Sequence, residues 1–377
     1  MASFFFLLSL SLIFCLCLII RSIDSAEVKP RAFILAIRKD NVTLQYYTTV
    51  DTGTPLTYPD LVIDLGGQIL WFNCENGFNS STYRAVRCGS SKCKVAKGSG
   101  CVGCNGTPRP GCTNNTCGVY PYNPFSNLLY AGGLGEDSMA LYETDGVSYL
   151  SHIYVPRLLF ACGFNDQLQG LANGTQGVIG LARTQVALQT QLSSAYKIQN
   201  KFALCLPSSS EDGLGDIFIG GGPYYMPPYN KDASTLLIKT PLIINPVSTA
   251  PIYSEGEHSD EYFINVKAIK INEKALVKEF VKKAASKGMT RVAPVAPFGE
   301  CFSAKNIRST VTGLTVPTIV LVLEGNRKYW NIYGGNSMVK ETVNIGILEE
   351  KRFMPRVHRW RFKPKNFNSI RRTSVGG

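Results

Sequence analysis

The chain has 377 residues, of which 45% are hydrophobic and 18% are charged, with 35 Gly, 20 Pro and 12 Cys. This composition excludes a disordered chain, a coiled coil and a collagen-like repeat, and it predicts a globular body of one or two domains. The formal net charge is +12, but residues 349–377 alone hold nine Lys and Arg against two Glu. Because the basic character belongs mainly to this tail, we expect no nucleic-acid partner.

An apolar run at the amino terminus predicts a secretory signal peptide at 1–26. It extends from Phe4 to Ile20, is followed by Arg21, and ends among small residues such as Ser25 and Ala26. An uncleaved anchor is the alternative, since a membrane-spanning helix needs about 20 apolar residues. We expect the signal to be removed and the mature chain to make no membrane contact.

Five N-x-[ST] sequons in the mature sequence predict N-glycosylation sites. They are Asn41, Asn79, Asn105, Asn114 and Asn173. Together with the signal peptide, these sequons favour a secreted glycoprotein.

Short apolar or β-branched runs bounded by Gly, Pro, Asp or Asn predict a mainly β architecture. In chain order, the clearest runs are 44–50, 61–63, 69–74, 202–206, 217–219 and 318–323. The run 262–272 alternates between apolar and polar residues, and its phase changes near Ala268, which predicts a β-bulge.

One amphipathic helix is predicted at 276–287. Phe280, Val281, Ala284 and Ala285 lie on one face of it, and Gly288 is typical of a helix end. We therefore expect a mainly β protein with one or two short helices.

Cysteine usage agrees with secretion, because disulfides persist in oxidising compartments. Once Cys15 and Cys17 leave with the signal, eight of the ten remaining cysteines form a predicted disulfide framework, with its connectivity left open. They are Cys74, Cys88, Cys93, Cys101, Cys104, Cys112, Cys117 and Cys162. A zinc site using the C-x-x-C at Cys101 and Cys104 is the less favoured alternative. We expect no metal and no cofactor.

The basic tail at 349–377 mixes Arg, Lys, Phe and Trp360 without strand alternation or a helical period. A solvated chain end is expected there. An RNA or an acidic polysaccharide as partner is the alternative.

The segment 59–72 has the pattern of a strand, an aspartate on a tight glycine turn, and a returning strand. With the other motifs, it resembles the pepsin-like aspartic peptidases, and among them the plant branch of xylanase inhibitors, extracellular dermal glycoproteins and basic seed globulins. The matching motifs are Val62–Gly67, Leu70–Cys74, Tyr83–Ser90, Gly177–Leu181, Lys201–Leu206, Tyr262–Val266 and Val295–Phe302. The resemblance covers about residues 28–345.

This resemblance implies a two-lobe, pepsin-like β-barrel fold. The amino-terminal lobe would span 27–206 and a truncated carboxyl-terminal lobe 207–348, followed by the divergent tail. Relatives carry several tens of residues between positions corresponding to Lys274 and Val277, and they continue differently after Val339. We therefore expect an incomplete carboxyl lobe with exposed sheet edges, in a divergent or mis-spliced product.

Aspartic peptidases need two carboxylates that share one proton, each on a D-[ST]-G turn. The resemblance places the first aspartate at Asp64, where Leu65 replaces the expected Thr or Ser. The D-T-G at 51–53 falls where the family has a hairpin, so we interpret it as a decoy. No second D-[ST]-G is present in the carboxyl half. We therefore predict no intact catalytic site and no peptidase activity.

Other catalytic schemes lack a motif in this sequence. The three histidines, His152, His258 and His358, belong to no Ser-His or Cys-His signature. The sequence also contains no H-E-x-x-H and no P-loop motif.

Members of the branch resemble peptidases that have lost catalysis and instead block microbial glycoside hydrolases. This implies a xylanase or a xyloglucan endoglucanase as partner, in plant defence at the cell wall. Endoglucanase-inhibiting relatives carry an Arg at the position of Val311, and Arg308 is near but not equivalent. The alternatives are a storage or wall glycoprotein without a specific target, and a residual aspartic-type endopeptidase.

Cys205 and Cys301 would lose the partners that they have in relatives. Two outcomes are open: the two cysteines pair with each other, which needs Cα atoms within about 7 Å, or they remain thiols.

Overall fold

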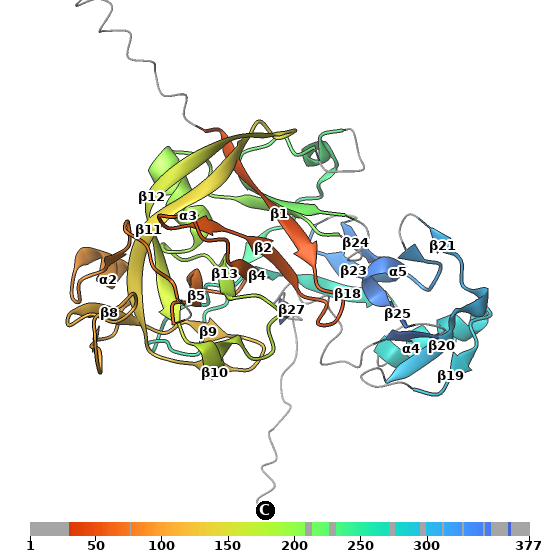
Figure 1. Ribbon diagram of the computed structural model, residues 1–377. Helices are drawn as coiled ribbons and strands as arrows, with labels where there is room; N and C mark the ends of the chain where they lie inside the picture. The colour runs from red at the N-terminus through yellow and green to blue at the C-terminus, as the bar shows by residue number, and fades with distance from the viewer. Residues whose placement is uncertain are drawn as a thin grey trace, which may run out of the picture.

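The computed structural model describes residues 30–75, 77–207, 213–225, 231–270, 276–294, 299–310, 313–325, 328–341, 344–347 and 361–362. The predicted signal peptide and most of the basic tail lie outside these residues. Strands dominate the described residues, in two groups that Figure 1 shows from red to green and from teal to blue. We call them the amino-terminal barrel, residues 30–220, and the carboxyl-terminal unit, residues 263–347.

The amino-terminal barrel is a closed ring of seven strands. In spatial order these are β1 (Ala32–Lys39), β2 (Tyr46–Thr49), β4 (Asp60–Asp64), β13 (Gly177–Gly180), β5 (Trp71–Asn73), β12 (Tyr149–Gly163) and β11 (Gly132–Thr144). The ring closes because β1 also pairs with β11, with Ala32 opposite Thr144. This closure leaves the long β11–β12 hairpin wrapped around one side of the core (Figure 1).

Two further strands extend the same sheet beyond β1. They are β14 (Phe202–Cys205) and β15 (Gly215–Gly220), and β15 pairs with β1 from Ala32 opposite Gly220 to Ile37 opposite Gly215. The lobe boundary predicted at 206 therefore falls between two paired strands of this sheet.

Short elements cover the barrel ends. The strands are β3 (Asp51–Thr52), β6 (Arg84–Ala85), β7 (Cys101–Val102), β8 (Thr116–Val119), β9 (Tyr122–Asn123) and β10 (Leu128–Leu129). The helices are α2 (Ser91–Val95), the 3-10 turn η1 (Asn165–Leu168) and α3 (Leu188–Tyr196). Ser90 caps α2 by accepting a hydrogen bond from Cys93 N.

The barrel core is built from the side chains of these strands that point into the barrel. Phe72 and Phe160 stack with ring centroids 4.4 Å apart, and Phe33 packs edge-on against Tyr196 of α3. Each such side chain contributes on the order of 1.5–3 kcal/mol by leaving water. This continuous core is what holds the turn at the end of β4 in place.

Four disulfides involve all eight cysteines of the predicted framework. They join Cys74 to Cys162, Cys88 to Cys101, Cys93 to Cys117, and Cys104 to Cys112. Three of the four close loops within 88–117, and the first links Cys74, the residue after β5, to β12. The two cysteines of the C-x-x-C segment therefore belong to two different disulfides, Cys88–Cys101 and Cys104–Cys112.

Of the two outcomes left open for Cys205 and Cys301, a disulfide between them is not among the described disulfides. Cys205 lies in β14 of the barrel sheet, whereas Cys301 is buried in β20 of a different sheet. The two strands belong to separate cores, which is the physical reason that the cysteines do not meet.

The carboxyl-terminal unit consists of small separate sheets around α4 (Leu276–Ser286). One sheet joins β18 (Val266–Lys270), β23 (Ile319–Leu323) and β24 (Tyr329–Ile332), and another joins β19 (Arg291–Val292), β20 (Glu300–Ser303), β26 (Asn344–Ile347) and β25 (Val339–Glu341). Two-residue strands β21 (Ser309–Thr310) and β22 (Gly313–Leu314) form a hairpin, and α5 (Gly334–Ser337) lies beside it. Unlike the barrel, these described strands form no closed ring.

A third small sheet lies between the barrel and the rest of the unit. It joins β16 (Leu242–Ile243), β17 (Phe263–Ile264) and β27 (Arg361–Phe362), and the 3-10 turn η2 (Ala233–Leu236) precedes it. The predicted bulge lies in β18, because the register of β18 with β23 shifts between Val266 and Ala268.

The unit still has its own apolar core. Phe280 and Ala284 of α4 are fully buried against Phe302, as the helical pattern predicts. Ala285, predicted on the same face, is instead exposed, because it lies about 100° around the helix from Ala284. Gly288 adopts a left-handed φ of 77° after the helix. A third 3-10 turn, η3 (Ala304–Asn306), follows β20. Among the residues that the structure describes, none of the helices has the length and apolar character of a membrane span.

Candidate functional site

Asp64 ends β4 at the centre of the barrel, on the turn that the sequence singled out. β4 runs parallel to β13, which places Gly180 opposite Asp64. The Asp64 Oδ1 atom accepts a 2.8 Å hydrogen bond from Gly66 N. The backbone carbonyl of Asp64 accepts a 2.9 Å hydrogen bond from Leu181 N. The residue is only 2% exposed.

The turn fits closely against β13 because both contact positions are glycine. A Cβ on Gly67 would lie 2.9 Å from the Gly180 Cα, and a Cβ on Gly180 would lie 2.5 Å from the Gly67 carbonyl oxygen. Leu65, at the position expected to carry a hydroxyl, is 3% exposed and packs in the barrel core. The side chain after the aspartate therefore contributes packing rather than a hydrogen bond.

A loop from the carboxyl side covers this turn. We call residues 245–261 the strap. Its two arms are joined by a hydrogen bond of 2.9 Å from Ser259 N to Asn245 O and by a 2.6 Å contact between the hydroxyls of Thr249 and Ser259. A compact loop with its ends held together in this way is an Ω-loop.

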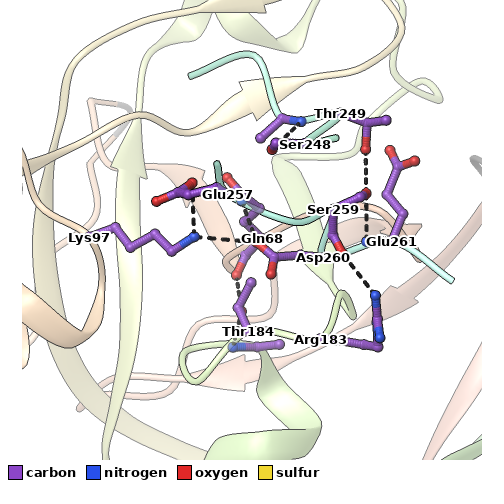
Figure 2. Close-up of polar contacts among 12 residues, drawn as sticks. Gln68, Lys97, Arg183, Thr184, Ser248, Thr249, Glu257, Ser259, Asp260 and Glu261 are labelled. Atoms are coloured by element: carbon purple, nitrogen blue, oxygen red, sulfur yellow. Dashed lines mark hydrogen bonds and ion pairs between the residues drawn. The ribbon is translucent and has the colours of Figure 1, made fainter. Parts of the chain in front are cut away.

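The strap is bound to the barrel by a cluster of polar contacts that centres on Asp260 (Figure 2). The Gln68 amide donates to Asp260 Oδ2 at 2.7 Å, and Arg183 N donates to the Asp260 carbonyl at 2.9 Å. The Arg183 guanidinium donates to the Ser259 carbonyl at 2.7 Å. Lys97 Nζ lies 3.7 Å from the Asp260 carboxylate and 3.3 Å from that of Glu257.

Two neighbouring bonds support this cluster. Thr184 Oγ1 donates to the Gln68 carbonyl at 2.5 Å. Gln68, which donates to Asp260, is therefore fixed in position by a second hydrogen bond. Just beyond the strap, the Tyr262 hydroxyl donates to the Leu181 carbonyl at 2.9 Å, and burial raises the pKa of Tyr262 to about 12. The strap is thus connected to the β4 turn and to the segment after β13.

The space between the strap and the Asp64 turn is about 30 Å³. Its lining combines the turn, the chain before β9 and the strap: Asp64, Gly66, Gly67, Gln68, Ile69, Trp71, Tyr120, Tyr122, Thr249, Ala250, Pro251, Asp260 and Glu261. One buried water needs roughly 10–15 Å³, so this space has room for about two or three waters and for no peptide.

Three carboxylates line this space, and two of them were not predicted as site residues. Neither Asp260 nor Glu261 belongs to a D-[ST]-G motif, yet the strap carries both to the cavity that Asp64 lines. The only available signal was their position beside the Tyr262–Val266 motif. Among the described residues, no His, Cys, Asp or Glu cluster has a metal-binding arrangement.

The D-T-G at Asp51 lies elsewhere. Asp51 and Thr52 form β3, which pairs with β11, and the Asp51 carboxylate lies 3.8 Å from His152 Nε2. Burial raises the pKa of Asp51, and the nearby His152 opposes that rise. The cavity lining includes Asp64 and not Asp51, in agreement with the decoy interpretation.

The other predicted site residues lie on the surface. All five sequon asparagines, Asn41, Asn79, Asn105, Asn114 and Asn173, are exposed. Arg308 is exposed just before the β21–β22 hairpin, whereas Val311 and His358 lie outside the described residues.

A closed barrel with an aspartate on a glycine-packed turn at the end of β4 defines a pepsin-like protein. Two family profiles match the chain: "Xylanase inhibitor N-terminal" over residues 46–221 and "Xylanase inhibitor C-terminal" over residues 274–348. The chain belongs to this xylanase-inhibitor family of pepsin-like proteins.

Individual relatives agree with this assignment. The "Probable aspartic proteinase GIP2" of Nicotiana benthamiana is 40% identical over 362 residues, covering 86% of this chain and 82% of the relative. The crystal structure of "edgp" is 41% identical with a TM-score of 0.79, covering 85% of this chain and 86% of that one. The basic 7S globulin from soybean is 30% identical with a TM-score of 0.71, covering 85% of each chain.

Proposed function

We propose that this protein is a secreted, non-catalytic glycoprotein that binds and inhibits microbial glycoside hydrolases, such as a xylanase or a xyloglucan endoglucanase, at the plant cell wall. The observation that carries the non-catalytic part is the strap over Asp64. It leaves about 30 Å³ in front of the aspartate, where a peptidase must admit a substrate chain. The two family profiles support an inhibitory role, because both are described as xylanase inhibitor domains.

The rigidity of the body suits an inhibitor. Binding costs less free energy when the contact surface is already ordered. The four disulfides and the Asp260 cluster hold the barrel and the strap in one arrangement before any partner arrives.

A peptidase assay tests the non-catalytic part. Wild-type protein and the Asp64→Asn variant are incubated with denatured haemoglobin between about pH 2 and pH 5, the range in which a coupled carboxylate pair titrates. We expect no turnover from either protein. Turnover by the wild type that is lost in Asp64→Asn would show an active peptidase.

An inhibition assay tests the binding part. A fungal xylanase and a xyloglucan endoglucanase are titrated with the protein, and reducing-sugar release is followed. We expect saturable inhibition of at least one enzyme at micromolar protein, near 8 kcal/mol of binding free energy. The Arg308→Ala variant tests whether the β21–β22 side of the carboxyl-terminal unit contacts the hydrolase. Lys305→Ala, which alters another exposed residue nearby, is its matched control.

A storage or wall glycoprotein is the second candidate. The similarity to the soybean basic 7S globulin favours it. Abundance in the seed together with no saturable inhibition of either hydrolase would support this candidate over the first.

A further inference from the structure

A second cavity lies on the outside of the barrel, beside the turn between β1 and β2. Its volume is about 410 Å³, within the roughly 300–1,000 Å³ of small-molecule sites. Its lining residues are Arg38, Lys39, Asp40, Asn41, Tyr47, Gly213 and Leu214. The sequon asparagine Asn41 is therefore itself part of the cavity wall.

Three adjacent strands place an arginine between two apolar surfaces there. Arg38 lies opposite Tyr47 of β2, and the pairing of Ile37 with Gly215 brings Leu214 alongside Arg38 from the other strand. Directly opposite residues share one face of a sheet. Leu214 is 55% exposed, so this apolar surface faces solvent.

The arginine is held in position by its own contacts. Its guanidinium donates to Thr49 Oγ1 at 2.9 Å and lies 3.7 Å from the Asp60 carboxylate. An arginine has five N–H donors, so these contacts leave it capacity to donate to a further ligand.

The turn that carries Asn41 is also braced. Asp40 Oδ2 accepts hydrogen bonds of 2.6 Å from both the backbone and the hydroxyl of Thr43, the third residue of the sequon. Asp40 N donates to the Gln45 carbonyl at 2.8 Å. A group attached to Asn41 would therefore begin at a fixed point on the rim of the cavity.

We propose that Asn41 carries an N-linked glycan whose first N-acetylhexosamine units occupy this cavity. A pyranose has a face of C–H groups and a rim of hydroxyl and acetamido groups. The face would pack on Tyr47 and Leu214, and the rim would accept hydrogen bonds from Arg38. The glycan would cover the exposed Leu214 and the end of the β1–β15 pair at Ile37 and Gly215.

The attachment itself follows ordinary transferase chemistry. The Asn41 side-chain nitrogen forms a bond to the anomeric carbon of a lipid-diphosphate-linked oligosaccharide. The bond between that carbon and the diphosphate oxygen breaks, the diphosphate leaves with the electron pair, and the amide proton passes to a base of the transferase. The proposal rests on the proposed function in one respect, since this reaction requires entry into the secretory pathway.

The test compares two glycans on the same molecule. The full chain is secreted from plant cells whose mannose trimming is blocked, and glycopeptides are mapped by mass spectrometry. The folded protein is then treated with an endoglycosidase that cuts between the first two sugars, and release is timed at Asn41 and at the exposed control Asn114. We expect release at Asn41 to be about tenfold slower, because a docked sugar must first leave the cavity.

A lining variant supplies the second arm. Leu214→Ser changes an exposed side chain and keeps the sequon, and we expect it to speed release at Asn41 while leaving Asn114 unchanged. In amide hydrogen exchange, Asn41→Gln should raise exchange at 213–220, and Asn114→Gln should not.

The outcomes of this test distinguish failure of the docked glycan from failure of the proposed function. Equal release rates at Asn41 and Asn114, or no glycan at Asn41 in a protein glycosylated elsewhere, would overturn the docked glycan and leave secretion intact. Absence of glycan at all five sequons of the secreted protein would overturn the docked glycan, and absence of the protein from the medium would overturn secretion. Neither result bears on hydrolase inhibition, which has its own assay.

Discussion

The Gln68 side-chain amide donates a 2.7 Å hydrogen bond to the Asp260 carboxylate across 192 positions of sequence. Gln68 belongs to the turn after Asp64, and Asp260 belongs to the strap, so this bond joins the position of the first catalytic aspartate to the loop that covers it. Arg183 and Lys97 bind the same segment of the strap. Asp260 is therefore the residue on which the closure of the site depends most.

Replacing Asp260 should loosen the strap. We expect Asp260→Ala to lower the free energy of unfolding by about 2 kcal/mol, because Gln68 loses a charged hydrogen-bond partner. Lys97 is 53% exposed and should contribute only about 0–1 kcal/mol of that loss. Urea unfolding measures the first quantity, and amide exchange at 245–261 measures the opening.

Two variants control this prediction. Asp260→Asn keeps an acceptor for Gln68 and should lose less stability than Asp260→Ala, while Glu255→Ala alters an exposed residue of the same strap and should change little. Unchanged exchange in Asp260→Ala would show that the strap is held by other contacts.

Gly180 should tolerate no side chain. A methyl group there would lie 2.5 Å from the Gly67 carbonyl and 2.6 Å from the Ile69 carbonyl, so β13 and the Asp64 turn would have to separate. We expect Gly180→Ala to cost about 1–3 kcal/mol. The control Gly103→Ala meets no atom within 4 Å and should stay within about 0.5 kcal/mol. Equal unfolding midpoints for the two variants in urea would contradict the close packing of this turn.

The disulfides should differ in what they contribute. The Cys74–Cys162 bond spans 88 residues and the Cys88–Cys101 bond spans 13. Constraint of the unfolded chain grows with loop length, so the paired serine variants should lose about 4–5 and about 3 kcal/mol, respectively. Guanidinium unfolding of the two double variants compares them. A larger loss at Cys88–Cys101 would mean that loop length does not set their order.

Cys205 should react slowly with alkylating reagents. Burial raises the pKa of its thiol, and the charge of Asp216 on the neighbouring strand raises it further. Only the thiolate reacts, so the rate should keep rising above about pH 8.5, where an ordinary cysteine levels off.

The Asp216→Asn variant separates the two causes. It removes the negative charge and keeps an acceptor for the Tyr149 hydroxyl, so alkylation of Cys205 at pH 8 should rise about two- to threefold. Asp232→Asn, which removes a carboxylate bound to Ser234 and Tyr224, is the control. Mass spectrometry of the Cys205 peptide gives the alkylation rate in each protein. Equal rates in the wild type and in Asp216→Asn would rule out an effect of the Asp216 charge.

Local patterns in the sequence account for much of the fold. The runs at 61–63 and 217–219 lie inside β4 and β15, and the amphipathic pattern at 276–287 matches α4 to within one residue. These elements were predictable because each buries a face that repeats with its own period. The β11–β12 hairpin was not predicted. β11 is glycine-rich where it passes close to other strands, and the outer half of β12 is exposed, so neither shows a simple alternation.

Some features of the candidate site could likewise be predicted from the sequence, and others could not. The sequence by itself determined the family, the aspartate at Asp64, the loss of the neighbouring hydroxyl at Leu65 and the eight-cysteine framework, because these are statements about residue type and spacing. Only the tertiary structure decided the disulfide connectivity, the strap and the presence of Asp260 and Glu261 beside Asp64. Those features depend on contacts between segments separated by tens to hundreds of residues, and such contacts leave no period or spacing for the sequence to show.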